Sequence, residues 1–304
     1  MSPARIEACD GEPSDGLVSG TVAFANQKGG VGKTTTVVNL AAELALAGST
    51  VLVVDIDPQG SATSAMGSDK ATVSGSVYEG LLELTPLSDL VVRSPIDGLD
   101  LIPSSLALAG AEIELVPLER RERRLASLLA GSTSRYDHVF IDCPPSLGLL
   151  TVNALTAASE VVIPVQCEYL ALEGLGRLLS AIGLMRENLN PGLEVSGVIL
   201  TMHDRRTNLC LDVERDVRDH FDGRVYDTVV PRNVRLSEAP SHGLPIALYS
   251  PSSRGAEAYR KLAAEFRARR TASAFDRAAP AFERAASAFE GAASAFDRAA
   301  GAVA

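Results

Sequence analysis

Short runs of apolar residues alternate along the middle of the chain with longer stretches in which apolar residues recur at helical spacing. The runs are rich in valine and isoleucine, which is typical of strands buried on both faces of a parallel sheet. They cover residues 21–26, 50–56, 99–102, 138–142, 161–165, 197–200 and 225–230. This succession predicts an α/β fold with a doubly wound, mostly parallel sheet flanked by helices.

Helical periodicity occupies the segments between these runs. After Gly32, the residues Val37, Leu40, Ala41 and Leu44 recur on one face of a helix that reaches Gly48. Further helices are expected near 77–83, over 105–129, around 170–188 and over 210–220. Because strands and helices alternate without a break, we expect a single domain over residues 21–270.

The two ends of the chain differ from this domain in composition. Residues 1–20 are rich in Ser, Gly, Pro and acidic side chains, which predicts a disordered leader. Residues 271–304 repeat every seven residues, so that Phe275 and the three phenylalanines after it stand a heptad apart. Pro280 and Gly291 interrupt this repeat, so a docking amphipathic helix and a partly ordered extension both stay open.

Charge and cysteine content set limits on the class of protein. The 304 residues carry a formal net charge of −10, and the four cysteines show no paired spacing. A chain of this size does not need disulfides, so a reducing cytoplasm is the expected compartment. The first 20 residues do not combine basic residues with a long apolar run, which disfavours secretion.

A glycine-rich segment between the first strand and the first helix carries the strongest chemical signal. It reads NQKGGVGKTT and contains two of the four lysines in the chain. Glycines allow backbone N–H groups to surround an anion, and a helix N-terminus adds partial positive charge. Lys33 is expected to contact the β- and γ-phosphates of ATP, and the Thr34 hydroxyl to bind Mg²⁺. The expected nucleotide-binding residues are Lys28, Gly29, Gly30, Val31, Gly32, Lys33, Thr34 and Thr35.

This segment matches the general P-loop pattern incompletely, because Gln27 replaces the glycine six residues before Lys33. A glycine-rich turn that serves only packing is therefore an alternative. Acidic residues downstream argue against that alternative. Asp55 and Asp57 follow the second strand, and Asp142 ends the strand at 138–142. The carboxyl ends of parallel strands share one edge of the sheet, so these carboxylates should meet the loop and support Mg²⁺-assisted hydrolysis.

Four segments in the same order resemble the ParA/Soj family of chromosome- and plasmid-partition ATPases, which have a deviant Walker A loop. They are QKGGVGKTTTVVNL, VLVVDIDPQGSAT, HVFIDCPPSLG and PRNVRLSEAPSHGLPI. The resemblance implies a Mg-ATP-dependent switch that forms a sandwich dimer when ATP is bound. Lys28 matches the signature lysine that reaches the partner's nucleotide, and a charge supplied in trans couples hydrolysis to dimerisation.

The resemblance also implies roles for the acidic residues and for the C-terminal half. Asp57 matches the residue that positions the attacking water, Asp142 the Walker B aspartate near Mg²⁺, and Asp55 an accessory acid in the metal shell. Family members bind DNA without sequence preference through arginines, so binding should weaken as salt rises. The matching arginines here are Arg206, Arg232 and Arg235, and Pro231 and Asn233 match positions that border the adenine.

The implied biology is a slow ATPase on the nucleoid in the cytoplasm, with release from DNA stimulated by a ParB/Spo0J-like partner. The main alternative is a MinD-like division-site ATPase bound to the membrane. The repeat at 271–304 has three arginines against four acidic residues, so attraction to anionic lipid is expected to be weak. A reductase with an iron–sulfur cluster would need two suitable cysteines per subunit, and Cys167 has no obvious mate in the sequence.

Overall fold

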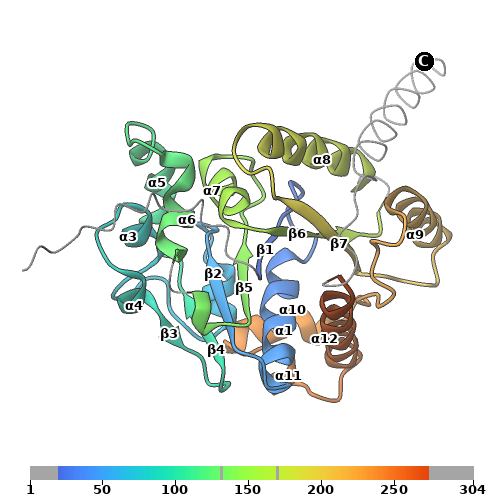
Figure 1. The fold of residues 1–304 in the computed structure, drawn as a ribbon. Coiled ribbons are helices and arrows are strands. Elements are labelled where there is room, and N and C mark those ends of the chain that lie inside the picture. The colour runs from blue at the N-terminus through green and yellow to red at the C-terminus, as the bar shows by residue number, and fades with distance from the viewer. Residues whose placement is uncertain (1–19, 131–132, 169–170, 274–304) are drawn as a thin grey trace, which may run out of the picture.

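A seven-stranded sheet forms the centre of the protein (Figure 1). The computed structural model describes residues 20–130, 133–168 and 171–273. The strands run in the order β3-β4-β2-β5-β1-β6-β7, and all neighbours are parallel except β3 and β4. Their bounds are β1 (Thr21–Phe24), β2 (Val51–Asp55), β3 (Val92–Arg93), β4 (Leu99–Ile102), β5 (His138–Asp142), β6 (Glu160–Gln166) and β7 (Glu194–Thr201). The predicted doubly wound α/β fold is confirmed.

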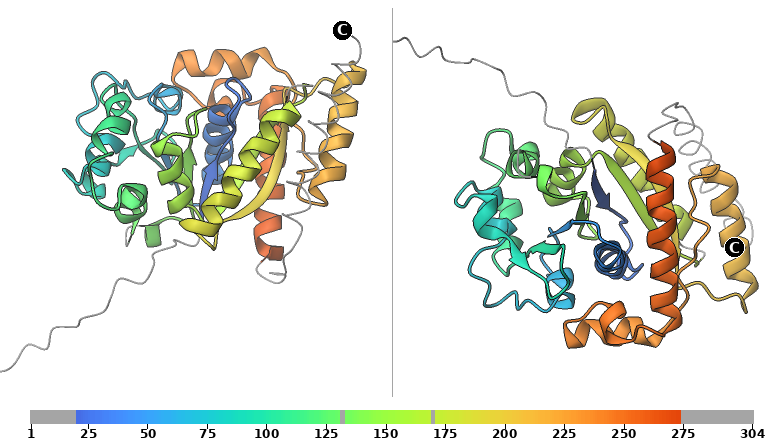
Figure 2. Two further views of the ribbon diagram at one scale, coloured as in Figure 1. Left: turned by 90° about the horizontal axis from the view of Figure 1, so that it is seen from above. Right: turned by 60° about the horizontal axis from the view of Figure 1, so that its bottom comes forward.

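Helices cover both faces of the sheet (Figures 1 and 2). One face packs against α1, α11 and α12, and the other against α3 and α5 to α8, while α9 lies beyond β7. The helix bounds are α1 (Lys33–Leu46), α2 (Ser61–Ala65), α3 (Val77–Leu81), α4 (Leu87–Leu90), α5 (Leu108–Glu114), α6 (Arg124–Leu129), α7 (Leu149–Ala157), α8 (Ala171–Asn188), α9 (Asn208–Phe221), α10 (Val234–Glu238), α11 (Ile246–Tyr249) and α12 (Arg254–Ser273).

The apolar runs serve two separate cores because successive side chains of a strand point to opposite faces. In β2, Leu52 and Val54 belong to one core, whereas Val51 and Val53 belong to the other. All four are fully buried. This explains why the strands read as continuous apolar runs and not as alternating patterns.

The position of β1 determines where a ligand can bind. β1 lies between β5 and β6, so the chain leaves it towards β2 on one side and later crosses from β5 to β6 on the other. Ligands of open α/β sheets bind beyond the carboxyl ends of the strands where the strand order reverses in this way. The glycine-rich loop begins at this point, directly after Phe24.

The prediction of one helix over 105–129 is wrong. The segment divides into α5, a short 3-10 helix at Arg121–Arg123 and α6. Pro117 has no backbone N–H to continue a helix, and Arg120 adopts a left-handed conformation with φ of 52°. Both residues lie in the break between α5 and the 3-10 helix.

The prediction of a strand over 225–230 is also wrong. Isolated bridges link this region to β7 and the residues after it, Val198 with Val225 and His203 with Pro231, and the Val230 N–H donates to the Leu200 carbonyl, but no continuous strand forms. The N–H groups of Asp227 and Thr228 donate to the Glu265 carboxylate of α12, at 2.8 and 2.9 Å. Glu265 therefore binds the backbone groups that a continuous ladder would need.

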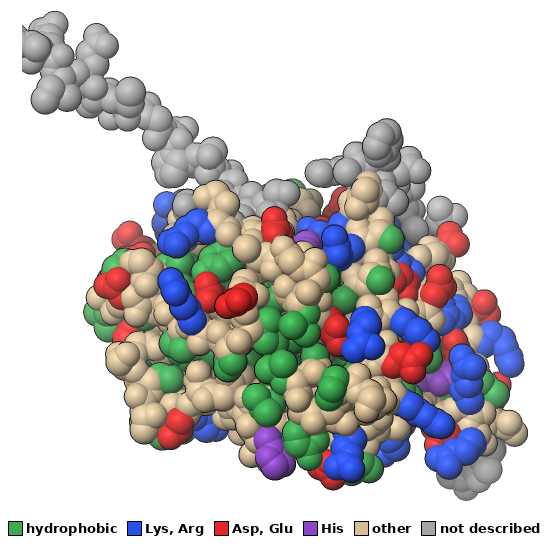
Figure 3. Space-filling view, turned by 90° about the horizontal axis from the view of Figure 1, so that it is seen from below, with side chains coloured by type: hydrophobic (Ala, Val, Ile, Leu, Met, Phe, Trp, Pro, Cys, Tyr) green, Lys and Arg blue, Asp and Glu red, His purple; other side chains and the backbone are tan. Residues whose placement is uncertain are grey.

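Both predicted termini lie largely outside the part of the chain that the structure describes. This holds for residues 1–19 of the leader and for residues 274–304 of the heptad repeat. Within the described ranges, none of the helices is both long enough and apolar enough to cross a membrane. Seen from below, basic and acidic side chains intermingle on the side of α9 and α12, and apolar side chains gather near the middle of the face (Figure 3).

The half-buried His138 on β5 makes folding stability depend on pH. Its ring packs edge-on against Phe266 at 5.5 Å, and burial with the nearby Arg270 lowers its pKa to about 4. The folded state thus disfavours protonation, so stability is lost as pH falls from the unfolded pKa of about 6.5 to the folded value. In the wild type, the free energy of unfolding should fall between pH 7 and pH 4.5, and in His138→Phe this fall should be smaller by up to about 3 kcal/mol. Urea unfolding at the two pH values measures the difference. An unchanged slope of stability against pH in the variant would contradict this role.

Candidate active site

Two glycines allow the loop after β1 to turn into α1. Gly30 and Gly32 have φ values of 76° and 85°, which side chains other than glycine rarely adopt. Gly32 is the N-cap residue directly before α1. A Cβ atom added at Gly29 or Gly30 would have no atom within 4 Å. The backbone of the loop therefore faces open space, as an anion cradle requires.

Two buried polar side chains hold the loop against the neighbouring strands. The Asn26 amide donates to the Pro164 carbonyl of β6 at 2.8 Å, and its oxygen accepts from the Lys28 N–H at 3.0 Å. The Thr201 hydroxyl at the end of β7 donates to the Val31 carbonyl at 2.7 Å. Sequence reasoning missed both residues, because the spacing between Thr201 and the loop gives no sign of contact.

Lys33 projects from the first turn of α1 into a buried setting. Only 7% of the residue is exposed, and its ammonium group lies 3.4 Å from the Lys28 carbonyl. Burial lowers the pKa of Lys33, whereas the negative charges of Asp142 and Asp57 act in the opposite direction. The ammonium group is therefore placed among carboxylates with little competition from water.

The three predicted acidic residues meet at the carboxyl ends of β2 and β5, but they differ in their surroundings. Parallel pairing places Asp55 directly beside Asp142. Asp55 accepts from the Thr63 N–H and hydroxyl at 2.7 and 2.6 Å, and burial raises its pKa to about 6. Asp57 accepts from the Gln59 N–H at 2.9 Å. Asp55 and Asp57 thus have a structural role as well, because their carboxylates accept hydrogen bonds that stabilise the turns after β2.

Asp142 is the exception among these acids. It is fully buried, and neither carboxylate oxygen has a hydrogen-bond partner within the described residues. Burial and the neighbouring Asp55 raise its pKa well above the usual range, and the charge of Lys33 opposes that rise. The Thr34 hydroxyl also opposes it, although its geometry falls short of a hydrogen bond. Burial of a carboxylate without a hydrogen-bond partner is unfavourable unless a cation neutralises its charge, so Asp142 is a candidate cation ligand.

A cavity of about 440 Å³ lies between the loop and Asp57, whereas the buried Asp55 and Asp142 do not line it. Asp57 faces it, together with Lys33 and the hydroxyl-bearing Thr34 and Thr35. Met202, Pro240 and Leu244 supply an apolar wall, whereas Pro231 and Asn233 do not line this cavity. A role of those two residues in contacting adenine stays a prediction.

The residues present fit a hard divalent cation. Asp142 offers two unpartnered oxygens, and the Thr34 hydroxyl lies beside it at the wall of the cavity. Mg²⁺ prefers a small number of carboxylate and hydroxyl oxygens together with water and phosphate oxygens. Asp55 fits less directly, because its oxygens already accept from Thr63 and Asp57.

Lys28 does not point to the site of its own subunit. Its ammonium group pairs with the Glu168 carboxylate just beyond β6, at 3.0 Å, and both side chains are partly exposed. The other carboxylate oxygen of Glu168 accepts from the Gln166 amide. The two lysines of the loop therefore have different surroundings, one buried among acids and one at the surface.

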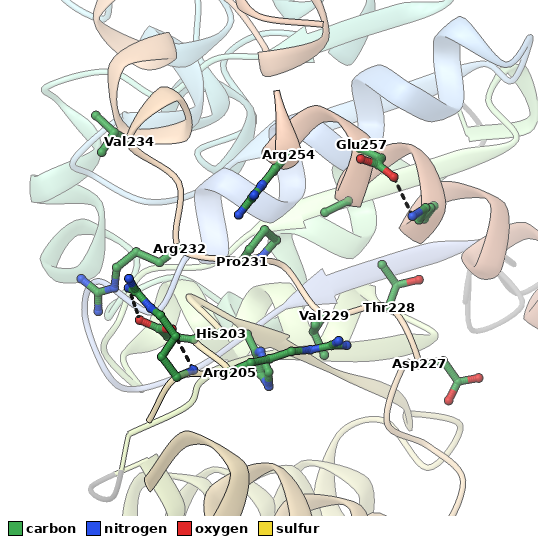
Figure 4. Close-up of a pocket in the computed structure, with 14 residues that line it drawn as sticks. His203, Arg205, Asp227, Thr228, Val229, Pro231, Arg232, Val234, Arg254 and Glu257 are labelled. Carbon is green, nitrogen blue, oxygen red and sulfur yellow. Dashed lines mark hydrogen bonds and ion pairs between the residues drawn. The ribbon is translucent and has the colours of Figure 1, made fainter. Parts of the chain in front are cut away.

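A second hollow, of about 890 Å³, lies between the residues after β7 and the start of α12 (Figure 4). Figure 4 shows Arg205, Arg232 and Arg254 around it. Five basic side chains line it against three acidic ones: Arg205, Arg206, Arg232, Arg254 and Lys261 against Asp204, Asp227 and Glu257.

The three arginines expected to bind DNA differ in position and pairing. Arg206 forms two bonds to the Asp204 carboxylate, at 2.9 and 2.7 Å. Arg235 lies outside the hollow and pairs with Glu238 at 2.8 Å. Arg232 lines the hollow, and its guanidinium has no ion pair within the described residues. Lys261 also lines this hollow, although sequence reasoning did not single it out.

Comparison with known proteins supports the family resemblance found in the sequence. The AAA domain family matches residues 19–195. The chain is 57% identical over 244 residues to the sporulation initiation inhibitor protein Soj of Bacillus subtilis, covering 80% of this chain and 96% of that protein. It is 48% identical to the chromosome partitioning protein ParA of Myxococcus xanthus, covering 86% and 92%.

A solved structure from Mycobacterium smegmatis, titled cobyrinic acid a,c-diamide synthase with bound ADP and magnesium, is 39% identical with a TM-score of 0.74. It covers 84% of this chain and 97% of that one. The Pyrococcus furiosus cell division ATPase MinD, at 23% identity and a TM-score of 0.69, shares the fold. The ordered motifs, the loop geometry and the identity to Soj and ParA lead to one conclusion: this chain belongs to the ParA/Soj family of chromosome-partitioning ATPases.

Proposed function

We propose that this protein hydrolyses Mg-ATP to control its attachment to DNA during chromosome or plasmid partition. The observation that carries the proposal is the unpartnered, buried Asp142, whose charge acts on Lys33, while Lys33 itself lines a cavity whose backbone suits phosphates. Family membership and the ADP and magnesium named for the Mycobacterium smegmatis structure support it. Turnover is expected to be slow without a partner.

The residues of the loop divide the work of binding. Backbone N–H groups between Gly29 and Thr35 surround the phosphates, and the buried Lys33 neutralises their charge. Thr34 and Asp142, with Asp55 as an accessory acid, would hold Mg²⁺, which would supply charge neutralisation at the phosphate oxygens. Asp57 faces the cavity just after β2 and, in this proposal, would orient the attacking water.

Lys28 acts on the nucleotide of a second subunit in this proposal. Its pair with Glu168 is partly exposed, so separation of the two side chains requires little free energy, about 1 kcal/mol or less. In an ATP-bound homodimer, Lys28 exchanges Glu168 for the phosphates across the interface. Hydrolysis then depends on dimerisation, as with an arginine finger supplied in trans.

The arginine-lined hollow is the proposed DNA-binding surface. Arg232 is exposed and carries no ion pair within the described residues, so it can contact a phosphate without first leaving a carboxylate. Arg206 and Arg235 are further proposed contacts, although each must exchange an acidic neighbour. A ParB/Spo0J-like partner would stimulate hydrolysis and release the protein from the nucleoid in the cytoplasm.

The first test separates nucleotide binding from hydrolysis. Lys33→Ala removes the buried ammonium group and should weaken ATP binding about 10- to 100-fold, because a charged hydrogen bond contributes about 1.5–3 kcal/mol. Asp57→Ala should retain binding but lower turnover about 10²- to 10⁴-fold and leave the ATP-bound dimer on DNA. Fluorescent-ATP titration and phosphate release measure the two effects. Unchanged turnover in Asp57→Ala would contradict the assigned role.

The second test concerns Lys28 and its partner in the same subunit. Lys28→Ala should bind ATP normally yet hydrolyse it about 10³-fold more slowly, because the charge supplied in trans is lost. Glu168→Gln is the matched control, since it releases Lys28 without removing it and should raise turnover by at most about fivefold. Single-turnover hydrolysis at several protein concentrations separates the steps. Equal loss of turnover in both variants would argue against action in trans.

The third test concerns DNA. Arg232→Ala should reduce the slope of log affinity against log salt concentration by about 1, because one phosphate contact is lost. Arg215→Ala is the control, because Arg215 is exposed on α9, pairs with Asp212 and does not line the hollow. Binding is measured by fluorescence anisotropy with ATP on two unrelated duplexes. Equal slopes in wild type and Arg232→Ala would exclude this contact.

A further inference from the structure

Three buried side chains with metal-binding atoms converge outside the ATP site. They are Cys167 directly after β6, His203 two residues after β7, and Cys210 in the first turn of α9. One ligand atom from each lies within 4.8 Å of the other two. All three residues are at most 7% exposed. Cys167 therefore does have a mate in the fold, although the sequence spacing gave no sign of it.

The neighbours of this cluster orient its members. The Nε2 atom of His203 lies 2.7 Å from the Glu214 carboxylate, which Arg218 holds through its other oxygen at 3.0 Å. Nδ1 is then the ring nitrogen left for a cation. Metal-binding histidines commonly have such a carboxylate on the opposite nitrogen, because it fixes the ring and raises its basicity. The Asp204 N–H also donates to the Cys210 sulfur at 3.3 Å.

We propose that Cys167, His203 and Cys210 bind one Zn²⁺ ion, with a water or other small ligand in the fourth position. Two sulfur atoms and one imidazole nitrogen suit Zn²⁺ and exclude the Mg²⁺ chemistry of the ATP site, which uses oxygen ligands. Small shifts of these side chains would bring their ligand atoms to tetrahedral positions around one ion. Zn²⁺ binds the thiolate form of cysteine, so its binding releases the thiol protons.

Two simpler explanations account for less of the geometry. Buried cysteines often act as small apolar side chains, but that role does not explain a buried histidine held by an ion-paired carboxylate. A disulfide between Cys167 and Cys210 would use both sulfurs and would not involve His203.

The position of the cluster gives the ion a structural role. Cys167 precedes Glu168, the partner of Lys28, and the His203 carbonyl accepts from the Arg232 N–H at 3.2 Å. Zn²⁺ would thus fix the ends of β6 and β7 and the start of α9 between the Lys28 surface and the arginine-lined hollow. Loss of the ion should loosen this junction while the loop that carries Lys33 stays in place.

The test uses the full chain, stripped of metal and kept reduced. We expect one equivalent of Zn²⁺ to bind in competition with a chromophoric chelator, and Co²⁺ to give sulfur-to-metal charge-transfer and tetrahedral d–d bands. Cys167→Ala and Cys210→Ala should abolish both signals. Cys9→Ala and Cys143→Ala are the matched controls and should leave them unchanged. Free Zn²⁺ at about 100 times its Kd should raise the Tm of wild type by roughly 5–10 °C and leave that of Cys210→Ala unchanged.

Several results would overturn the proposal. One is the absence of a thiolate band in wild type with Co²⁺, which can be judged even if the variants fail to fold. Another is Zn²⁺ binding that survives Cys210→Ala, or that Cys143→Ala removes equally. A Cys167–Cys210 disulfide found by mass spectrometry in protein that binds no Zn²⁺ would assign the pair to redox chemistry instead.

Discussion

The excess of acidic over basic side chains at the carboxyl ends of β2 and β5 is the constraint on which the rest of the structure depends. Three carboxylates, Asp55, Asp57 and Asp142, meet there, and Lys33 is the buried cation beside them. Parallel pairing makes Asp55 and Asp142 direct neighbours, so their mutual repulsion cannot be relieved by a change of rotamer alone. Burial of like charges disfavours ionisation, which is why the pKa values of both rise.

The surrounding residues stabilise the three carboxylates to different extents. Thr63 donates twice to Asp55, and Gln59 donates to Asp57, so turns after β2 stabilise two of the acids. Asp142 receives no such bond within the described residues. Asp142 therefore lacks a neutralising partner close to the cavity and the glycine-rich loop, where a cation bound with its nucleotide would supply positive charge.

The ends of β6 and β7 connect this site to two other surfaces. Asn26 ties the loop to Pro164 of β6, and Thr201 of β7 ties it to Val31. Two residues beyond the ends of these strands, Glu168 pairs with Lys28, and the His203 carbonyl accepts from the Arg232 N–H. The loop, the proposed dimer contact and the proposed DNA surface therefore all adjoin the carboxyl ends of β6 and β7. A movement of these strand ends would affect all three.

The sequence by itself determined the fold class, the phosphate loop and the acids at two strand ends, because each depends on local patterns. Apolar runs predict buried strands, and glycines with Lys33 predict an anion cradle. It failed in two places. Within one segment, Pro117 and Arg120 break an expected helix, and in another the distant Glu265 binds backbone that was expected to form a strand. Only the tertiary structure placed Thr201 on the loop, Glu168 on Lys28, and Cys210 beside Cys167 and His203. These pairings arise from the order of strands in the sheet, which brings together residues whose spacing along the chain carries no signal.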